Sequence, residues 1–245
     1  MKQPHILCDA NDVGKYVILP GDPQRVVRAA AYLEDCQEVA FNREFRTIKG
    51  YYKGVAVTIT STGIGGPSTA IAVEELIDCG AKYFIRIGSG GAIQWNIEIG
   101  DLIIATAAVR EDGASKMYVL ENYPAVADIQ LTYRILETCS RLKYKNHCGI
   151  IRSHDSFYID NEEEIMAFWN SKKVIASDME TATLFTLAQL RGVHAASILN
   201  NVVKYEGNVK DGINDYVENE AAAAEGEKRE ILLALETIYS LHHNS

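Results

Sequence analysis

Short runs of β-branched and apolar residues alternate along this chain with stretches that carry apolar residues every three or four positions. The first pattern predicts strands and the second predicts amphipathic helices. Strands are expected at Val17–Leu19, Val55–Ser61, Tyr83–Ile87, Leu102–Ala105, Cys148–Ile151, Val174–Ala176 and Ala195–Leu199. Helices are expected at Gln24–Leu33, Pro67–Cys79, Ile129–Arg141, Glu162–Trp169, Met179–Leu190 and Tyr216–Tyr239. This alternation predicts the α/β class, with a mixed central β-sheet flanked by helices.

The length of the chain favours one folding unit. Its 245 residues, 47% of them hydrophobic, are enough for a sizeable core, and no low-complexity stretch divides them. A single domain that spans residues 1–245 is therefore expected. Within it, Phe45–Lys53 and the alternating run after Gly54 predict a β-hairpin.

The charge of the chain excludes two classes of partner. The formal net charge is −9 and the isoelectric point is near 5.2, whereas binding to nucleic acid or a membrane surface needs a basic face. No apolar run approaches the ~20 residues of a membrane span, and Met1–His5 lacks the apolar stretch of a signal peptide. The cysteines form no Cys-x-x-Cys pair and are interpreted as reduced packing residues. We therefore expect a cytoplasmic protein.

A glycine turn follows the first predicted strand. The segment from Leu19 to Arg25 reads Leu-Pro-Gly-Asp-Pro-Gln-Arg and leads directly into a helix. Free backbone N–H groups and the positive end of a helix dipole meet at such a turn, and Arg25 adds a guanidinium that suits phosphate geometry. The same residues also suit an ordinary helix start, with Asp22 at the cap and Pro23 in the first turn. The motif alone is compatible with either interpretation.

Two further glycine-rich segments, Ser61–Ser68 and Arg86–Gly91, also stand at strand ends. In open α/β sheets the ligand crevice lies at the carboxyl ends of the strands. Arg86 stands inside an apolar strand, where a charge is costly unless it meets an anion or a buried carboxylate. Both partners are possible on the sequence alone.

Six segments, taken in order, resemble the hexameric nucleoside phosphorylases. They are Pro20–Arg25, Asn42–Glu44, Thr62–Ser68, Arg86–Ser89, Pro124–Asp128 and Asp178–Thr183. The match runs from His5 to about Val203, which is most of the chain. Within the family the uridine phosphorylases look most similar, and the bacterial purine nucleoside phosphorylases are related to them.

The resemblance implies a reaction in which phosphate attacks the anomeric carbon of a nucleoside and releases the base, giving ribose 1-phosphate. Inorganic phosphate is then a co-substrate, and no cofactor is required. The cleavage passes through an oxocarbenium-like state, so the enzyme must hold the nucleophile under the sugar. The resemblance assigns catalysis to Arg86 and Glu180, and it assigns phosphate binding to Gly21, Arg25, Arg86, Ser89 and a neighbouring subunit's Arg43.

The resemblance also implies shared sites in a homohexamer built as a trimer of dimers. The sugar would be bound by Met179, Glu180 and, from across the dimer interface, His5. A monovalent cation, potassium, is expected at the same interface, held by Glu44, Ile64 and Ser68; oxygen ligands suit a hard cation. A surface pairing of Glu44 with Arg43 is the competing explanation.

The base-binding residues implied by the resemblance are Phe157, Asn161, Val202 and Val203. Purine-specific members carry a proton-donating aspartate where this chain has Val203, so a pyrimidine is favoured. Uridine enzymes, however, read uracil with a glutamine and an arginine, and Asn161 and Glu163 stand here instead. Either Glu163 points to solvent or the pocket takes a different base. Asp178 also replaces the usual glutamate, which would weaken sugar contacts.

These features predict phosphorolysis of uridine or another pyrimidine nucleoside. The alternatives among enzymes are a purine nucleoside phosphorylase and a nucleosidase for methylthioadenosine-type substrates. The nucleosidases lack the phosphate arginines that this chain keeps. A non-catalytic nucleoside-binding or storage protein is the alternative from a different class, but such a protein would not need to bury three arginines and Glu180.

Overall fold

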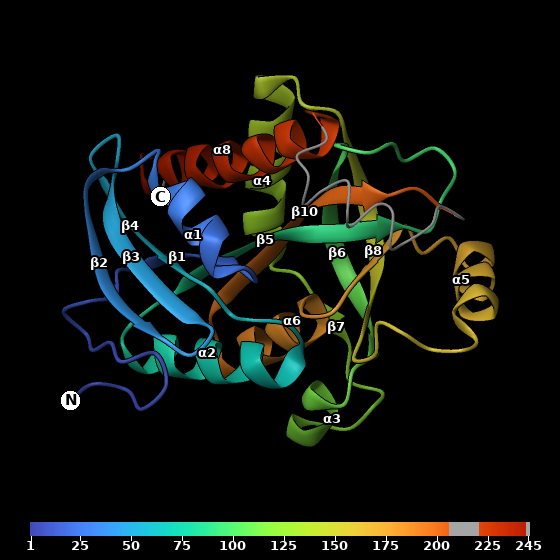
Figure 1. The fold of residues 1–245 in the computed structure, drawn as a ribbon, viewed down its shortest axis with the longest axis horizontal. Helices are drawn as coiled ribbons and strands as arrows, with labels where there is room; N and C mark the ends of the chain where they lie inside the picture. The colour runs from blue at the N-terminus through green and yellow to red at the C-terminus, as the bar shows by residue number, and fades with distance from the viewer. Residues whose placement is uncertain (206–220, 244–245) are drawn as a thin grey trace.

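The computed structural model describes residues 1–205 and 221–243, and the chain folds into alternating strands and helices (Figure 1). The elements are β1 (Tyr16–Pro20), α1 (Pro23–Ala30), β2 (Glu34–Asn42), β3 (Phe45–Tyr52), β4 (Val55–Thr60), α2 (Gly66–Asp78), β5 (Tyr83–Ala92), β6 (Leu102–Glu111), α3 (Ala114–Tyr118), β7 (Ala125–Val126), α4 (Ile129–Leu142), β8 (Asn146–His154), α5 (Glu162–Ser171), β9 (Ala176–Asp178), α6 (Thr181–Arg191), β10 (His194–Val203) and α8 (Ala221–His243).

All the described strands belong to one mixed sheet. Its order is β10-β6-β8-β9-β5-β1-β4-β3-β2, with β7 paired to β6. β1 runs parallel to β4 and β5, whereas β3 runs antiparallel to β2 and β4. β10 also pairs in parallel with β5, so strands β5, β9, β8, β6 and β10 close on themselves. The expected mixed sheet with flanking helices is confirmed.

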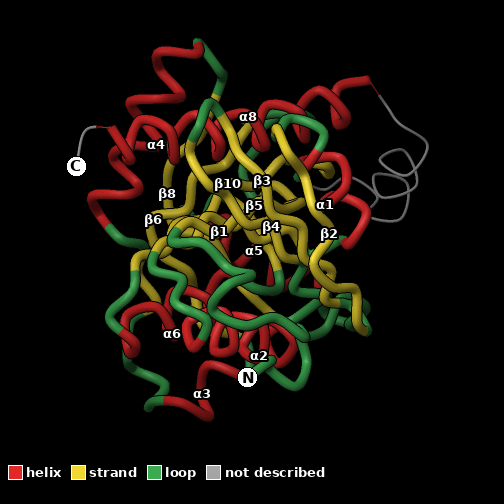
Figure 2. The backbone as a smooth tube through the Cα atoms, turned by 90° about the vertical axis from the view of Figure 1, so that its left-hand side faces the viewer, coloured by secondary structure: helices red, strands yellow, loops and turns green. Residues whose placement is uncertain are grey.

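Helices cover the sheet from two sides. α2 and α6 pack on each other below the strands in Figure 2, and α8 lies above them. Residues of α1, α4 and α8 share a second core. Along β5, Phe84 is buried in the core on the α2–α6 side of the sheet. Its neighbour Ile85 is buried in the core on the side of α1, α4 and α8. A strand covered on both faces reads as a continuous apolar run, which is why Tyr83–Ile87 shows no polar alternation.

Some elements differ from those expected from periodicity. The strand expected at Val174–Ala176 lies at Ala176–Asp178. β2 was not expected, because it pairs only with β3 and its residues from Glu34 to Glu38 are exposed; β7 and α3, at two and five residues, are too short for a periodic signal. The helix expected at Tyr216–Tyr239 is described only from Ala221, and its start lies outside the described residues.

The helices and the cysteines can be compared with the expectations of no membrane span and of reduced thiols. No helix in the described ranges has both the length and the apolar character needed to cross a bilayer. All five cysteines are free thiols: Cys8, Cys79 and Cys139 are buried, and Cys36 and Cys148 are exposed.

Candidate active site

Four of the predicted phosphate residues, Gly21, Arg25, Arg86 and Ser89, lie near the end of β1 and the middle of β5. In the sheet Leu19 is opposite Arg86 and Pro20 is opposite Ile87, so Gly21 follows the end of β1, whereas β5 continues to Ala92. The segment Arg86–Gly91, expected at a strand end, therefore lies within the strand. The backbone N–H of Gly63 donates to the carbonyl of Gly21 at 3.0 Å. A Cβ on Gly21 would lie 3.2 Å from the carbonyl oxygen of Gly63. This close approach brings the second glycine segment against the first.

The first glycine turn is a helix start, as one of its two interpretations expects. The Asp22 carboxylate caps α1 by accepting from the backbone N–H groups of Gln24, at 2.8 Å, and Arg25, at 3.1 Å. The side chain of Arg25 is nevertheless buried, with 3% of the residue exposed, and its Nη2 donates to Ser89 Oγ at 3.0 Å. The helix cap therefore positions a buried cation against another predicted phosphate residue.

Arg25 is also held by two carboxylates of α8 that the sequence analysis missed. Its Nε donates to Glu227 at 2.9 Å, and its Nη1 lies 3.4 Å from Glu230. Glu230 is fully buried and accepts from the backbone N–H of Gly88 at 3.2 Å. The sequence feature that could have identified them is a pair of acidic residues three positions apart in a predicted helix, followed by apolar residues.

Arg86 pairs with core carboxylates and still has an unused donor. Its Nε donates to Asp178 at 2.9 Å and its Nη2 to Glu180 at 2.5 Å. Among the described residues, Nη1 is buried without a hydrogen-bond partner. Burial lowers the pKa of Arg86, but Glu180 and Asp178 outweigh it and raise the pKa above its ordinary value. A Cβ on Gly88 would lie 2.7 Å from Nη2, so glycine is needed there.

Glu180 is held by the second glycine segment as well as by Arg86. Its Oε1 accepts from the backbone N–H of Gly65 at 2.6 Å, where Gly65 has φ of 90°, a conformation that favours glycine. Burial raises the pKa of Glu180, while Arg86 opposes the rise. The carboxylate therefore has a fixed orientation between two glycine-rich segments.

Asp178 is held by several groups of the protein. Besides Arg86, it accepts from Ser153 Oγ at 2.5 Å and from the backbone N–H and hydroxyl of Thr181, at 3.0 and 2.5 Å. Its shorter side chain thus acts on Arg86 and on the start of α6. Met179, between Asp178 and Glu180, is half-buried.

His5 and Arg43 lie on one part of the protomer surface. The Nδ1 of His5 lies 2.6 Å from Glu75 Oε1, and the backbone N–H groups of His5 and Ile6 also donate to Glu75. The side-chain amide of Asn42 donates to the His5 carbonyl at 2.7 Å, which joins the N-terminal segment to the β2–β3 turn. Arg43 is exposed in that turn and has φ of 55°.

Two of the three expected cation ligands are in contact. Ser68 Oγ lies 2.6 Å from Glu44 Oε1 and 2.6 Å from the carbonyl of Thr62. The hydrogen bond from Ser68 lowers the pKa of Glu44 below its ordinary value. Ile64 is 78% exposed. Within residues 1–205 and 221–243, no group of three or more His, Cys, Asp or Glu side chains could hold a metal ion.

The expected base-binding residues fall into a buried and an exposed set. Val202 and Val203 are buried and pack with Ala223 of α8. Phe157 is half-buried, and its ring meets Tyr158 edge to face at 5.0 Å.

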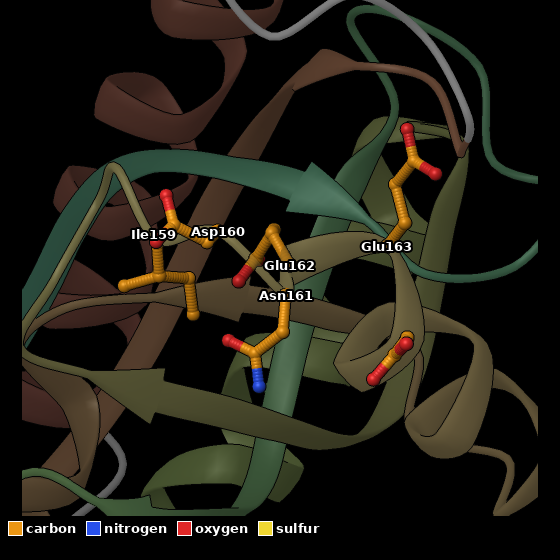
Figure 3. Close-up of a pocket in the computed structure, with 6 residues that line it drawn as sticks. Ile159, Asp160, Asn161, Glu162 and Glu163 are labelled. Carbon is orange, nitrogen blue, oxygen red and sulfur yellow. The ribbon is translucent and has the colours of Figure 1, made fainter.

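Asn161 and Glu163 lie in the exposed set, beside a hollow of about 370 Å³ lined by residues 159–164. Both side chains are exposed and point in different directions, as Figure 3 shows. Their exposure favours the solvent-facing interpretation of Glu163.

Another buried arginine fixes this segment and was missed by the sequence analysis. Arg152 of β8 is 2% exposed; its Nη1 donates to Glu162 at 3.0 Å, and its Nε donates to Glu111. Glu162 is the first residue of α5, so Arg152 ties the start of that helix to the sheet. An arginine after Ile150 and Ile151 is the same signal that singled out Arg86.

Comparison with known proteins decides the family. Residues 15–235 match the family model described as "Phosphorylase superfamily". The chain belongs to this family. It is 45% identical over 242 residues to a uridine phosphorylase of Thermococcus kodakarensis, covering 94% of this chain and 86% of that protein. It is 43% identical over 197 residues to a guanosine phosphorylase of Halorubrum lacusprofundi, covering 80% and 81%.

Solved structures agree with the family and the fold. A crystal structure of uridine phosphorylase from Vibrio fischeri ES114 superposes with a TM-score of 0.92 at 46% identity, covering 98% of both chains. The expected resemblance is therefore confirmed. The expected enzyme class, a nucleoside phosphorylase and hence a pentosyltransferase, is confirmed with it.

Proposed function

We propose that this chain catalyses the phosphorolysis of uridine or another pyrimidine nucleoside, giving the free base and ribose 1-phosphate. The observation that carries the proposal is the unused Nη1 of Arg86, a buried cationic donor close to Arg25 and Ser89. A buried donor without a partner is costly, and a phosphate oxygen would satisfy it. Gly21 would supply backbone contacts at the same place.

The proposed reaction follows from the charged groups that would surround the sugar. Phosphate, held by Arg25, Arg86 and Ser89, would attack the anomeric carbon as the bond to the base breaks and its electrons leave with the base. Positive charge then builds up on the ribose ring. Glu180, paired with Arg86, would accept hydrogen bonds from the ribose hydroxyls and favour that charge, while Met179 would pack against the sugar.

The base is assigned from the apolar side of the pocket. Val203 has no proton to donate, and Val202 and Val203 form an apolar wall with Ala223, which suits a base that leaves without side-chain protonation. The uridine phosphorylases of Thermococcus kodakarensis and Vibrio fischeri support a pyrimidine. The guanosine phosphorylase of Halorubrum lacusprofundi makes guanosine the second substrate to test.

We also propose a homohexamer, a trimer of dimers, in which each site is completed by a neighbour's His5 and Arg43. The exposure of Arg43 and the attachment of His5 to the same turn support this assembly. The contact between Glu44 and Ser68 supports a potassium ion at the dimer interface, with Ile64 nearby in sequence. We further propose that residues 1–245 form a single domain. We also propose a cytoplasmic location, because free cysteines suit a reducing compartment.

One assay tests the reaction. The purified protein is incubated with uridine, deoxyuridine, thymidine, inosine, guanosine and methylthioadenosine, with and without phosphate, and free base is measured. We expect phosphate-dependent release of uracil. Release that does not need phosphate would indicate a nucleosidase, release from purine nucleosides alone would overturn the pyrimidine assignment, and no release from any nucleoside would favour a binding protein.

A further inference from the structure

The carboxylate of Glu227 lies between two arginines of α1. It accepts from Arg25 Nε at 2.9 Å and from two nitrogens of Arg28, of which Nη2 is 3.0 Å away. Arg28 Nη2 also donates to Asp22, the residue that caps α1, at 3.0 Å. Only 7% of Glu227 is exposed. The first turns of α8 and the whole of α1 are therefore joined through one buried acidic side chain.

We propose that Glu227 is the positioning residue of the phosphate site, and that it fixes the guanidinium of Arg25 so that this cation meets phosphate in a single orientation. The inference rests on the proposed phosphate site. Glu227 contacts the Nε edge of Arg25, while Nη2 at the other end donates to Ser89. A side chain that is already fixed loses less conformational freedom when its ligand binds.

Glu227 can orient Arg25 without cancelling its charge. Arg28 shares the same carboxylate through two hydrogen bonds, so one negative charge is divided between two guanidinium groups. Arg25 is thus held by an anion and remains cationic toward the side where phosphate is expected.

The backbone of α8 is fixed where Glu227 leaves it. The side-chain amide of Asn200 in β10 donates to the carbonyl of Ala223 at 2.8 Å. A Cβ on Gly226 would lie 2.0 Å from Asn200 Oδ1, so only glycine allows the helix to approach β10 this closely. The residue next in sequence is Glu227. Its reach toward Arg25 is set by a tight helix–strand contact.

The test is a comparison of Michaelis constants in the full-length enzyme. Glu227→Ala removes the acceptor, and we expect the KM for phosphate to rise about tenfold, because a charge-assisted hydrogen bond is lost. The KM for the nucleoside should stay within twofold. Glu227→Gln keeps an oxygen acceptor and should recover most of the phosphate affinity, whereas Glu227→Asp keeps the charge but loses the reach and should resemble the alanine variant.

A matched control comes from the same helix. Glu236 is another largely buried carboxylate of α8, which accepts from Tyr52 at 2.7 Å and from Lys53. Glu236→Gln should lower the melting temperature and leave the KM for phosphate unchanged. If the Glu227 variants raise both Michaelis constants equally, or neither, Glu227 has only a packing role and the inference is wrong. The aspartate and glutamine variants decide the question if the alanine variant does not fold.

A second comparison separates this inference from the phosphate site itself. Arg25→Ala should raise the KM for phosphate, and Glu227→Ala added to that variant should raise it no further. If Arg25→Ala has no effect, the proposed phosphate site is wrong. If Arg25→Ala acts and Glu227→Ala does not, the phosphate site stands and only the positioning role fails.

Discussion

At the scale of single residues, the site depends on buried charged groups whose hydrogen bonds are almost, but not completely, satisfied. Arg86 meets two carboxylates, Asp178 and Glu180, yet retains a donor that no described residue uses. Such a group has a structural and a chemical function at once. Its removal leaves two buried carboxylates unpaired, which is strongly destabilising, and also removes a donor for phosphate.

Substitution of Arg86 should separate these two functions. Arg86→Lys keeps the charge near Asp178 and Glu180 but cannot donate in a fork, so we expect a folded protein whose kcat/KM falls by about two to three orders of magnitude, a loss typical of one transition-state donor. Arg86→Ala should lose activity and also melt at a lower temperature. Arg191, an exposed partner of Glu74, provides the control Arg191→Ala. Near-normal phosphate-dependent turnover in Arg86→Lys would show that the site is misassigned.

A second residue-scale prediction concerns the tautomer of His5. Because Nδ1 lies 2.6 Å from Glu75, it carries the proton and donates it, which leaves Nε2 for another group. If Nε2 contacts a neighbour's sugar, Glu75→Gln should raise the KM for the nucleoside severalfold and leave the KM for phosphate unchanged. Steady-state kinetics with each substrate varied in turn would check this. Equal effects on both constants would mean that Glu75 only anchors the N-terminal segment.

At the scale of elements, α8 is the part of the site that could not be read from the sequence. The glycine segments after β1 and β4 and within β5 can be recognised in the sequence because few residues other than glycine fit such positions, and the parallel pairing of β1 with β4 and β5 brings them together. Glu227 and Glu230 are about two hundred residues from Arg25 along the chain. Their helical pattern shows which residues share a face, but only the packing of α8 on α1 and β5 shows what that face meets.

The same limit explains Arg152 in β8. Periodicity places it in a strand, and its charge predicts a buried partner, as it did for Arg86. Its partners Glu111 and Glu162 come from the end of β6 and the start of α5. Neither the order of the strands nor the position of α5 follows from the local sequence, and the resemblance to the family assigned nothing to this position.

Glu230 of α8 predicts that the binding of phosphate depends on pH. Burial raises its pKa to about 8, and the positive charges of Arg25 on α1 and Arg86 on β5 oppose the rise, while Glu227 on α8 adds to it. The carboxyl is therefore neutral at pH 7 and becomes negative as the pH passes 8. The added negative charge beside Arg25 should weaken the binding of phosphate, so the KM for phosphate should rise above pH 8.

The variant Glu230→Gln isolates this effect, because an amide stays neutral at every pH. The ionisation of phosphate itself is the same for both enzymes, so only the difference between the two profiles counts. We expect the KM for phosphate to rise between pH 7.5 and 9 in the wild type and to stay flatter in Glu230→Gln. Parallel profiles would show that Glu230 does not face the phosphate site.

At the scale of the whole molecule, an acidic protein must bind an anion. With a net charge of −9, the long-range field repels phosphate, so affinity has to come from local cations. Arg25 of α1 and Arg86 of β5 are such cations, and both are buried. The third predicted cation, Arg43, is exposed in a turn, and in the proposed hexamer a second protomer would supply it.

That arrangement can be tested by mixing two inactive proteins. Arg25→Ala lacks a residue of its own site, and Arg43→Ala lacks the residue that it would supply to a neighbour. Each homo-oligomer should lose most activity. In a mixed dimer, one site receives Arg25 from one chain and Arg43 from the other and is complete, so random exchange after mild denaturation and refolding should restore about a quarter of the wild-type sites in a two-fold symmetric pair. Phosphate-dependent uracil release measures the recovery. Because a self-contained site would gain nothing from exchange, mixtures no more active than their components would show that Arg43 acts within its own protomer or not at all.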